Sequence, residues 1–109
     1  MIGSFELDFM VPHDLPCFAG HFPAAPLVPG ALLLDWALAE MTARWGVVAD
    51  VKVKQCKFLQ PVLPGDTLQL FVTVDDHRVD FSWTKGSQLA CRGVLDRMPS
   101  PSHAPPTDD

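Results

Sequence analysis

The sequence predicts an α+β domain in which one helix packs on a single antiparallel sheet. Three observations lead to this expectation. The stretch Gly30–Trp45 is rich in Ala and Leu and is suited to a helix, a strand-like stretch precedes it, and four more follow it, separated by short turns. One helix among strands that are joined by short turns is typical of the α+β class.

The first strand is expected at residues 4–11, where apolar and polar side chains alternate loosely. Residues 12–30 then contain five prolines and cannot form a helix. This segment holds too many apolar residues for a disordered chain, so we expect a long ordered loop. Long ordered loops in small domains usually have a function.

The helix is expected to begin after Pro29 and to end at Gly46, a residue suited to a helix C-terminus. Every residue from 31 to 39 is apolar except Asp35. A helix that is apolar on nearly all sides is usually buried on nearly all sides. We therefore expect the sheet to curl around this helix.

The remaining strands are expected at residues 51–59, 67–74, 79–84 and 88–95, where the periodicity changes to two. The turns between them are Pro64-Gly65-Asp66, residues 75–77 and Lys85-Gly86-Ser87. From Pro99 the chain has four prolines in eleven residues and little to bury. The sequence therefore predicts a single domain over residues 1–97 and a disordered tail over 98–109.

Composition excludes several classes of protein. Of the 109 residues 48% are apolar and 19% charged, as in a globular domain, and the net charge of −5 is unlike that of a nucleic-acid binder. No apolar stretch is long enough for a membrane helix, and residues 1–9 lack the basic start of a secretory signal. The three cysteines lie far apart and form no disulfide framework or zinc pattern, which fits a cytoplasmic protein without a metal site.

Three residues are candidates for chemistry. Asp35 is the single carboxylate in the apolar helical stretch, and burial would favour its protonated form, a general acid; alternatively it only stabilises the helix N-terminus. His21, in the proline-rich loop, is a candidate base, although a loop histidine can simply be exposed or hydrogen-bonded. Gly30 opens the helix and would let a carbonyl approach its free N–H groups, or it is merely a helix breaker. His13 is a weaker candidate, and His77 is expected at the surface.

These residues together resemble a known family, the β-hydroxyacyl acyl-carrier-protein dehydratases of the hotdog fold. The signature loop of that family is Gly-His-Phe-Pro, two variable residues, Pro, two variable residues and Pro-Gly, which matches residues 20–30 here. Its catalytic acid follows the histidine by fourteen positions, and His21 plus fourteen is Asp35. A second family pattern fits Lys57-Phe58-Leu59-Gln60-Pro61-Val62-Leu63-Pro64-Gly65-Asp66. The short chain and the Asp, where one large branch has Glu, look more like the small dehydratases of aryl-polyene gene clusters.

The resemblance implies a helix wrapped by a curved sheet and a dimer in which two sheets join. It implies a catalytic pair of His21 and Asp35 from different subunits, with the Leu27 carbonyl orienting the imidazole and the Gly30 N–H holding the thioester carbonyl. Gly20 and Phe22 would line the substrate site. No cofactor is required, because the thioester itself acidifies C2 of the substrate.

The implied reaction is dehydration of a 3-hydroxyacyl thioester, carried by an acyl carrier protein, to the trans-2-enoyl thioester. A thioesterase of the same fold, an enoyl-CoA hydratase and a non-catalytic acyl-binding module stay open as alternatives. The expected partners are the acidic carrier protein and a second hotdog subunit, identical or different. Candidate residues for docking the carrier are basic: Arg44, Lys52, Lys54, Lys57, Arg78 and Arg92.

Overall fold

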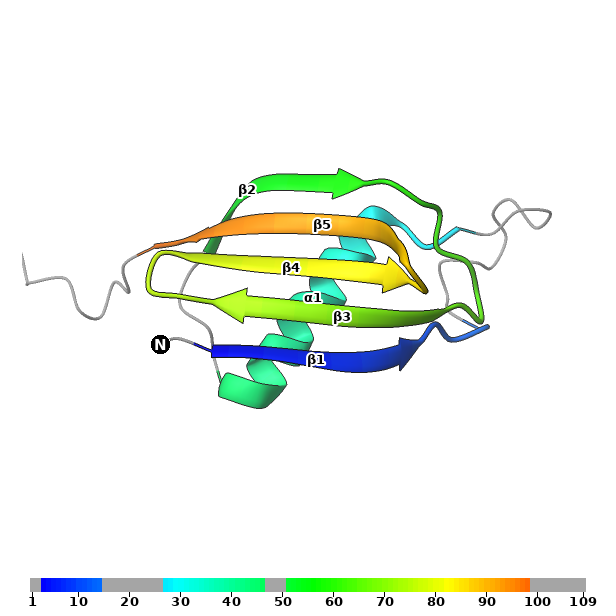
Figure 1. The fold of residues 1–109 in the computed structure, drawn as a ribbon, viewed down its shortest axis with the longest axis horizontal. Coiled ribbons are helices and arrows are strands. Elements are labelled where there is room, and N and C mark those ends of the chain that lie inside the picture. The colour runs from blue at the N-terminus through cyan, green and yellow to red at the C-terminus, as the bar shows by residue number, and fades with distance from the viewer. Residues whose placement is uncertain (1–2, 15–26, 47–50, 99–109) are drawn as a thin grey trace, which may run out of the picture.

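One helix lies across one face of a five-stranded antiparallel sheet (Figure 1). The computed structural model describes residues 3–14, 27–46 and 51–98. The elements are β1 (Gly3–Met10), α1 (Gly30–Trp45), β2 (Val51–Phe58), β3 (Thr67–Val74), β4 (Arg78–Lys85) and β5 (Gln88–Arg97). The sheet order is β1-β3-β4-β5-β2, so the expected α+β architecture is confirmed.

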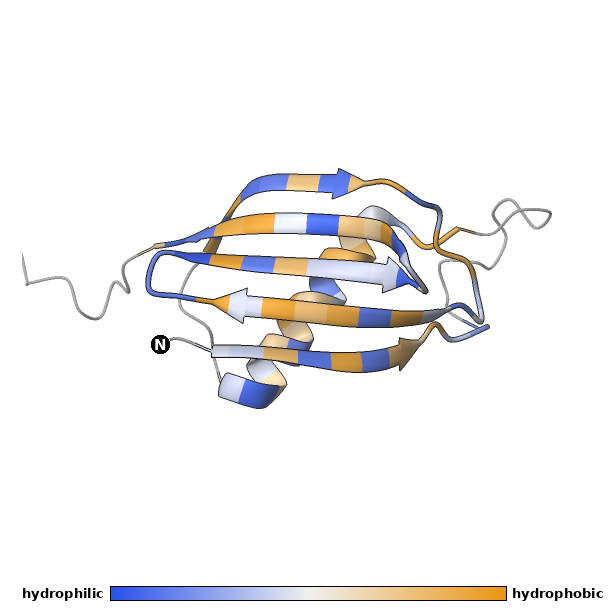
Figure 2. Cartoon of the chain, viewed as in Figure 1, coloured by the Kyte–Doolittle hydropathy of each residue, from blue (hydrophilic) through white to orange (hydrophobic). Residues whose placement is uncertain are grey.

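Strict alternation along β3 shows how the sheet obtains one apolar face. Its side chains are exposed and buried in turn, and Leu68, Leu70 and Val72 point toward the helix. Figure 2 shows the same alternation of orange and blue along the strands. A shift of one residue in the pairing would turn these side chains to solvent, so burial fixes the register.

The helix buries one side only. Leu33, Ala37 and Met41, spaced by four residues, face the sheet and are almost inaccessible to solvent. On the opposite side Ala31, Asp35 and Ala39 are exposed. The expectation of a helix buried on nearly all sides is therefore wrong for the single chain, because the sheet covers one face of α1 and nothing among the described residues covers the other.

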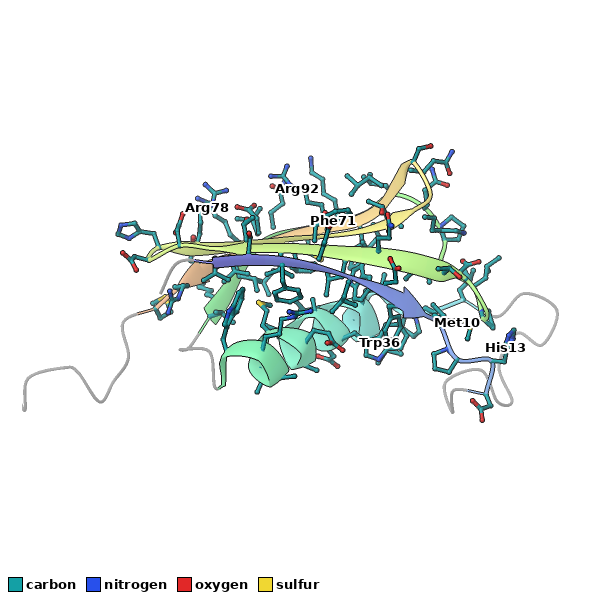
Figure 3. All side chains as sticks on the ribbon, turned by 60° about the horizontal axis from the view of Figure 1, so that its bottom comes forward. Met10, His13, Trp36, Phe71, Arg78 and Arg92 are labelled. Atoms are coloured by element: carbon teal, nitrogen blue, oxygen red, sulfur yellow. The ribbon has the colours of Figure 1, made fainter. Side chains whose placement is uncertain are left out.

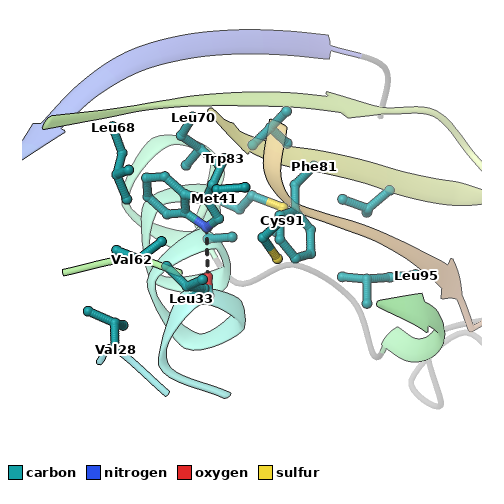
Figure 4. Close-up of a cluster of buried hydrophobic side chains, with 14 of the residues drawn as sticks. Val28, Leu33, Met41, Val62, Leu68, Leu70, Phe81, Trp83, Cys91 and Leu95 are labelled. Atoms are coloured by element: carbon teal, nitrogen blue, oxygen red, sulfur yellow. Dashed lines mark hydrogen bonds between the residues drawn. The ribbon is translucent and has the colours of Figure 1, made fainter. Parts of the chain in front are cut away.

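The core between helix and sheet is built around Trp83, which is fully buried in the central strand β4 (Figure 4). Its indole N–H donates a hydrogen bond of 2.9 Å to the carbonyl of Leu33 in the first turns of α1. Cys91 lies in the same cluster. Burial raises the pKa of the Cys91 thiol to about 12, and the neighbouring Cys56 thiol acts in the same direction.

Two strands form the edges of the sheet, β1 and β2. Most side chains of β2 are exposed, and its pairing with β5 shifts register between Val53 and Gln55. Val53 and Phe58 are about half exposed. This edge therefore combines unpaired backbone groups with exposed apolar side chains, which is a surface suited to pairing with another strand.

The helix α1 is too short and too polar to span a membrane, and no other helix lies among the described residues. The strand β5 ends at Arg97, and the domain boundary expected at residue 97 stays a prediction. The expected tail lies outside the described residues except for Met98, and so does most of the proline-rich loop.

Candidate active site

A cleft of about 270 Å³ opens at the N-terminus of α1. It lies between the start of the helix, the end of β2 and the chain that follows β2. Its described lining is apolar except for one amide side chain and contains no charged group. The lining residues are Leu27, Val28, Gly30, Leu33, Phe58, Leu59, Gln60, Pro61 and Val62. A concave apolar site of this kind is suited to an acyl chain.

Backbone hydrogen bonds hold both walls of the cleft. The Val28 N–H donates to the Val62 carbonyl at 2.8 Å, which ties the entry to the helix to the chain after β2. The N–H groups of Leu59 and Gln60 both donate to the Ala90 carbonyl, at 2.8 and 3.3 Å. The second wall is thereby attached to β5. Val28, Leu33 and Val62 are also part of the buried core cluster (Figure 4).

The helix N-terminus at the cleft carries no side-chain cap. Its N-cap residue is Pro29, whose backbone is extended, and no side chain hydrogen-bonds to the first turn among the described residues. The first N–H groups of a helix have no partner within the helix and carry the positive end of its dipole. Gly30 and Leu27, two of the expected site residues, both line the cleft, and the roles expected for their backbone groups stay predictions.

Phe58 is a site residue that the sequence reasoning did not single out. A Cβ built at Gly30 would lie 2.5 Å from two carbons of the Phe58 ring, so the ring rests directly on the glycine. The signal was present in the second family pattern, which includes Phe58. What sequence could not provide was the contact between residues 28 positions apart in the chain.

Asp35 does not lie in the cleft of its own chain. It is exposed on the outer side of α1, and it is absent from the lining residues. The expected burial of this carboxylate is therefore wrong for the single chain. His21, Gly20 and Phe22, the other expected site residues, lie outside the described residues, so the distance between His21 and Asp35 stays a prediction.

His13 and His77, the two histidines among the described residues, do not line the cleft. The ring of His13 packs against Gly65, whose φ of +82° and lack of a side chain both permit the contact. His77 is exposed in the turn between β3 and β4, as expected. In that turn the N–H groups of His77 and Arg78 both donate to the Asp75 carboxylate at 2.8 Å, and these bonds hold the pKa of Asp75 below its usual range.

The basic residues proposed for docking divide between two surfaces. Arg78 and Arg92 lie on the face of the sheet away from the helix, together with Phe71 (Figure 3). Both guanidinium groups approach the Asp80 carboxylate, at 3.4 Å each. Lys57 stands opposite Arg92 in the ladder between β2 and β5. Arg44 lies elsewhere, near the end of α1, with its guanidinium 4.4 Å from the centre of the Phe5 ring.

Among the residues described, no three His, Cys, Asp or Glu side chains are grouped in a way that could hold a metal ion. The cleft itself offers backbone N–H groups and apolar walls. A backbone N–H group beside apolar walls is an arrangement that can polarise and enclose a carbonyl group.

A long helix on a five-stranded antiparallel sheet, with a cleft at the helix N-terminus, defines the hotdog class. Solved structures support this: an (R)-hydratase from A. caviae, at 17% identity, shares the fold with a TM-score of 0.64 over 90% of this chain and 96% of that chain. The chain belongs to the ApeI-like family, whose model, described as ApeI dehydratase, matches residues 3–94.

Several proteins that are more similar in sequence to this chain are dehydratases by name. A 3-hydroxyacyl-[acyl-carrier-protein] dehydratase FabZ from Mannheimia succiniciproducens is 38% identical over 94 residues, covering 73% of this chain and 63% of that protein. The FabZ of Brucella abortus is 38% identical over 77 residues, covering 62% and 48%. The chain thus spans less than two thirds of the length of these relatives. The dehydratase heterocomplex ApeI:P from Xenorhabdus doucetiae matches with a TM-score of 0.71 and 26% identity, covering 85% of each chain.

Proposed function

We propose that this protein dehydrates 3-hydroxyacyl thioesters to trans-2-enoyl thioesters. The observation that carries the proposal is the uncapped start of α1, which opens at Gly30 into an apolar cleft in a chain of the ApeI-like family. A thioester carbonyl bound there would receive a hydrogen bond from the Gly30 N–H. That bond strengthens as negative charge develops on the carbonyl oxygen.

His21 is the proposed base that removes the proton from C2 of the substrate. Asp35, in its protonated form or through a water molecule, gives a proton to the C3 hydroxyl, which leaves as water. The Leu27 carbonyl would orient the imidazole, and Gly20 and Phe22 would adjoin the substrate in the same loop. His21 thus gains the C2 proton and Asp35 loses a proton to the departing water, and transfer of one proton from the imidazolium to the carboxylate restores both groups for the next turnover.

The exposure of Asp35 supports a site shared between two subunits. An acid on the outer side of α1 cannot serve the cleft of its own chain, but it can serve the cleft of a second hotdog subunit packed against that side. The exposed edge β2 offers a place where two sheets would join. The partner is either a second copy or a different hotdog chain, and the ApeI:P complex is an example of a dehydratase heterocomplex.

An acyl carrier protein is the proposed carrier of the substrate, since the FabZ relatives are named as dehydratases of carrier-bound 3-hydroxyacyl groups. Carrier proteins are acidic and require a basic surface. Lys57 and Arg92 stand opposite each other on the outer face of the sheet, whereas Phe58 points to the face that carries the helix and the cleft. The Asp80 carboxylate lies 3.4 Å from Arg92, so Lys57 is the proposed contact for an acidic carrier.

The test is incubation of the full chain with 3-hydroxyacyl carrier proteins, with straight-chain and aryl acyl groups, followed by intact-mass analysis. Loss of one water from the acyl group supports the proposal. Release of a free carrier thiol would instead identify a thioesterase, and hydration of 2-enoyl-CoA without action on carrier substrates would identify a hydratase. Sedimentation shows whether the chain is associated, and an associated chain that dehydrates no substrate contradicts the proposal.

A further inference from the structure

The Phe58 ring is seated on the α-carbon of Gly30. A Cβ at position 30 would meet three carbons of this ring, two at 2.5 Å and the third at 2.9 Å. Real Cβ atoms do not approach so closely, so the contact exists only because residue 30 has no side chain. The ring therefore borders the same backbone segment whose N–H is the proposed donor to the substrate carbonyl.

The backbone of Phe58 is anchored while its side chain is open to solvent. Phe58 is the last residue of β2 to pair with β5, opposite Cys91. The two N–H groups that follow it are both bound to the Ala90 carbonyl. Yet 53% of the residue is exposed, and its ring lines the apolar cleft. A phenyl ring left half exposed forgoes much of the free energy that its burial would contribute.

We infer that Phe58 determines acyl specificity, because its ring forms the wall against which the first carbons of the acyl chain lie when the thioester carbonyl reaches the Gly30 N–H. This inference rests on the proposed dehydration. The geometry limits the room beside the carbonyl, since the ring already occupies the space that a side chain at position 30 would need. A straight acyl chain can lie along the Phe58 ring, whereas a branch close to the carbonyl would clash with the ring.

The cleft walls beyond Phe58 support this assignment. Leu33 and Val62 are buried and fixed by the core, so their positions do not adapt to the substrate. Leu27 and Leu59 are about half exposed. Phe58 has the largest side chain among the described lining residues. It is half exposed and also contacts the start of the helix at Gly30.

The experiment compares Phe58→Ala and Phe58→Leu with wild type on straight-chain and 4-methyl-branched 3-hydroxyacyl carrier substrates. Phe58→Ala should raise KM for the straight chain about tenfold with a smaller change in kcat, because a lost apolar contact weakens binding throughout the reaction. The preference for the straight over the branched substrate should fall, and Phe58→Leu should restore part of it. Met10→Ala is the control, since Met10 is an exposed apolar residue at the end of the far edge strand β1 and does not line the cleft.

A second measurement tests the contact itself without using activity. Gly30→Ala should lower the thermal unfolding temperature, and adding Phe58→Ala in the same chain should recover part of that loss by vacating the space. If wild type dehydrates the substrates but Phe58→Ala leaves both KM and the straight-to-branched preference within twofold of wild type, the specificity role is overturned and the proposed function stands. If wild type dehydrates nothing, both are overturned.

Discussion

The indole N–H of Trp83 and the carbonyl of Leu33 are joined by a hydrogen bond of 2.9 Å that links the central strand β4 to the first turns of α1. Leu33 also lines the cleft. The bond therefore connects the core of the domain with the wall of the candidate site. Since it is buried and joins residues 50 positions apart, it orders two elements that no local interaction could place.

Replacing Trp83 by Phe should lower the free energy of unfolding by about 2 kcal/mol, because the variant loses a buried hydrogen bond and part of a packed ring. Denaturant unfolding measures the change. Trp45→Phe is the control, since Trp45 is only partly buried at the other end of the helix. Equal losses for the two variants would contradict the role given to the bond.

Gly65→Ala should destabilise the protein more than Gly86→Ala. Both glycines have positive φ, at +82° and +59°, so each substitution has a conformational cost of about 1 kcal/mol. At Gly65 the new methyl group would also meet the His13 ring, while nothing lies within 4 Å of the corresponding position at Gly86. Thermal unfolding of the two variants gives the difference, and His13→Ala should reduce it. A larger loss at Gly86 would refute the packing argument.

The protein should become less stable as pH rises from about 9 to about 12. The folded-state pKa of Cys91 is raised to about 12 from an ordinary value of 9.0. The unfolded state therefore releases its thiol proton first, and the stabilisation present below pH 9 is lost as pH rises through this interval. Unfolding at pH 8 and pH 10.5 measures the effect, and Cys91→Ala should show a weaker pH dependence. Because the chain contains no tyrosine, phenol ionisation does not contribute. A pH dependence unchanged in the variant would contradict the assignment.

His21→Ala and Asp35→Asn should each lower kcat by about 10²–10⁴, the usual contribution of a general acid or base. Far-ultraviolet circular dichroism and sedimentation should show folded, associated protein in both cases. In a homodimer the two variants, mixed and reassociated, should recover about a quarter of wild-type activity, because half of the dimers would carry one intact site of two. Wild-type turnover in either variant would exclude the pair, and no recovery on mixing would argue against sharing between identical subunits.

Much of the fold was accessible from sequence because the elements have strong local signals. The helix bounds and those of β3 agree with expectation, since Pro29 and Gly46 delimit the helix and β3 alternates strictly. The ends of β1, β4 and β5 differ by one or two residues, where strand pairing and not side-chain type decides the limit. The spatial order, in which β2 joins the sheet beside β5, has no local signal.

The candidate site was harder to predict. The apolar run around Asp35 suggested burial, but a helix in one chain is buried only where that chain covers it, and here the sheet covers one side. An apolar pattern indicates that a helix face is suited to burial, but it does not say whether the chain itself or a partner would bury that face. The contact between Phe58 and Gly30 could not be predicted because it depends on where β2 ends relative to the helix.

The half-covered helix has a consequence for the cell. Leu32, Leu34 and Leu38 remain only partly buried in the single chain, beside exposed alanines on the same helix. If the second hotdog subunit proposed above covers this surface, copies that have not bound it would expose an apolar patch to chaperones and proteases. The amount of the protein in the cell would then depend on the supply of that subunit.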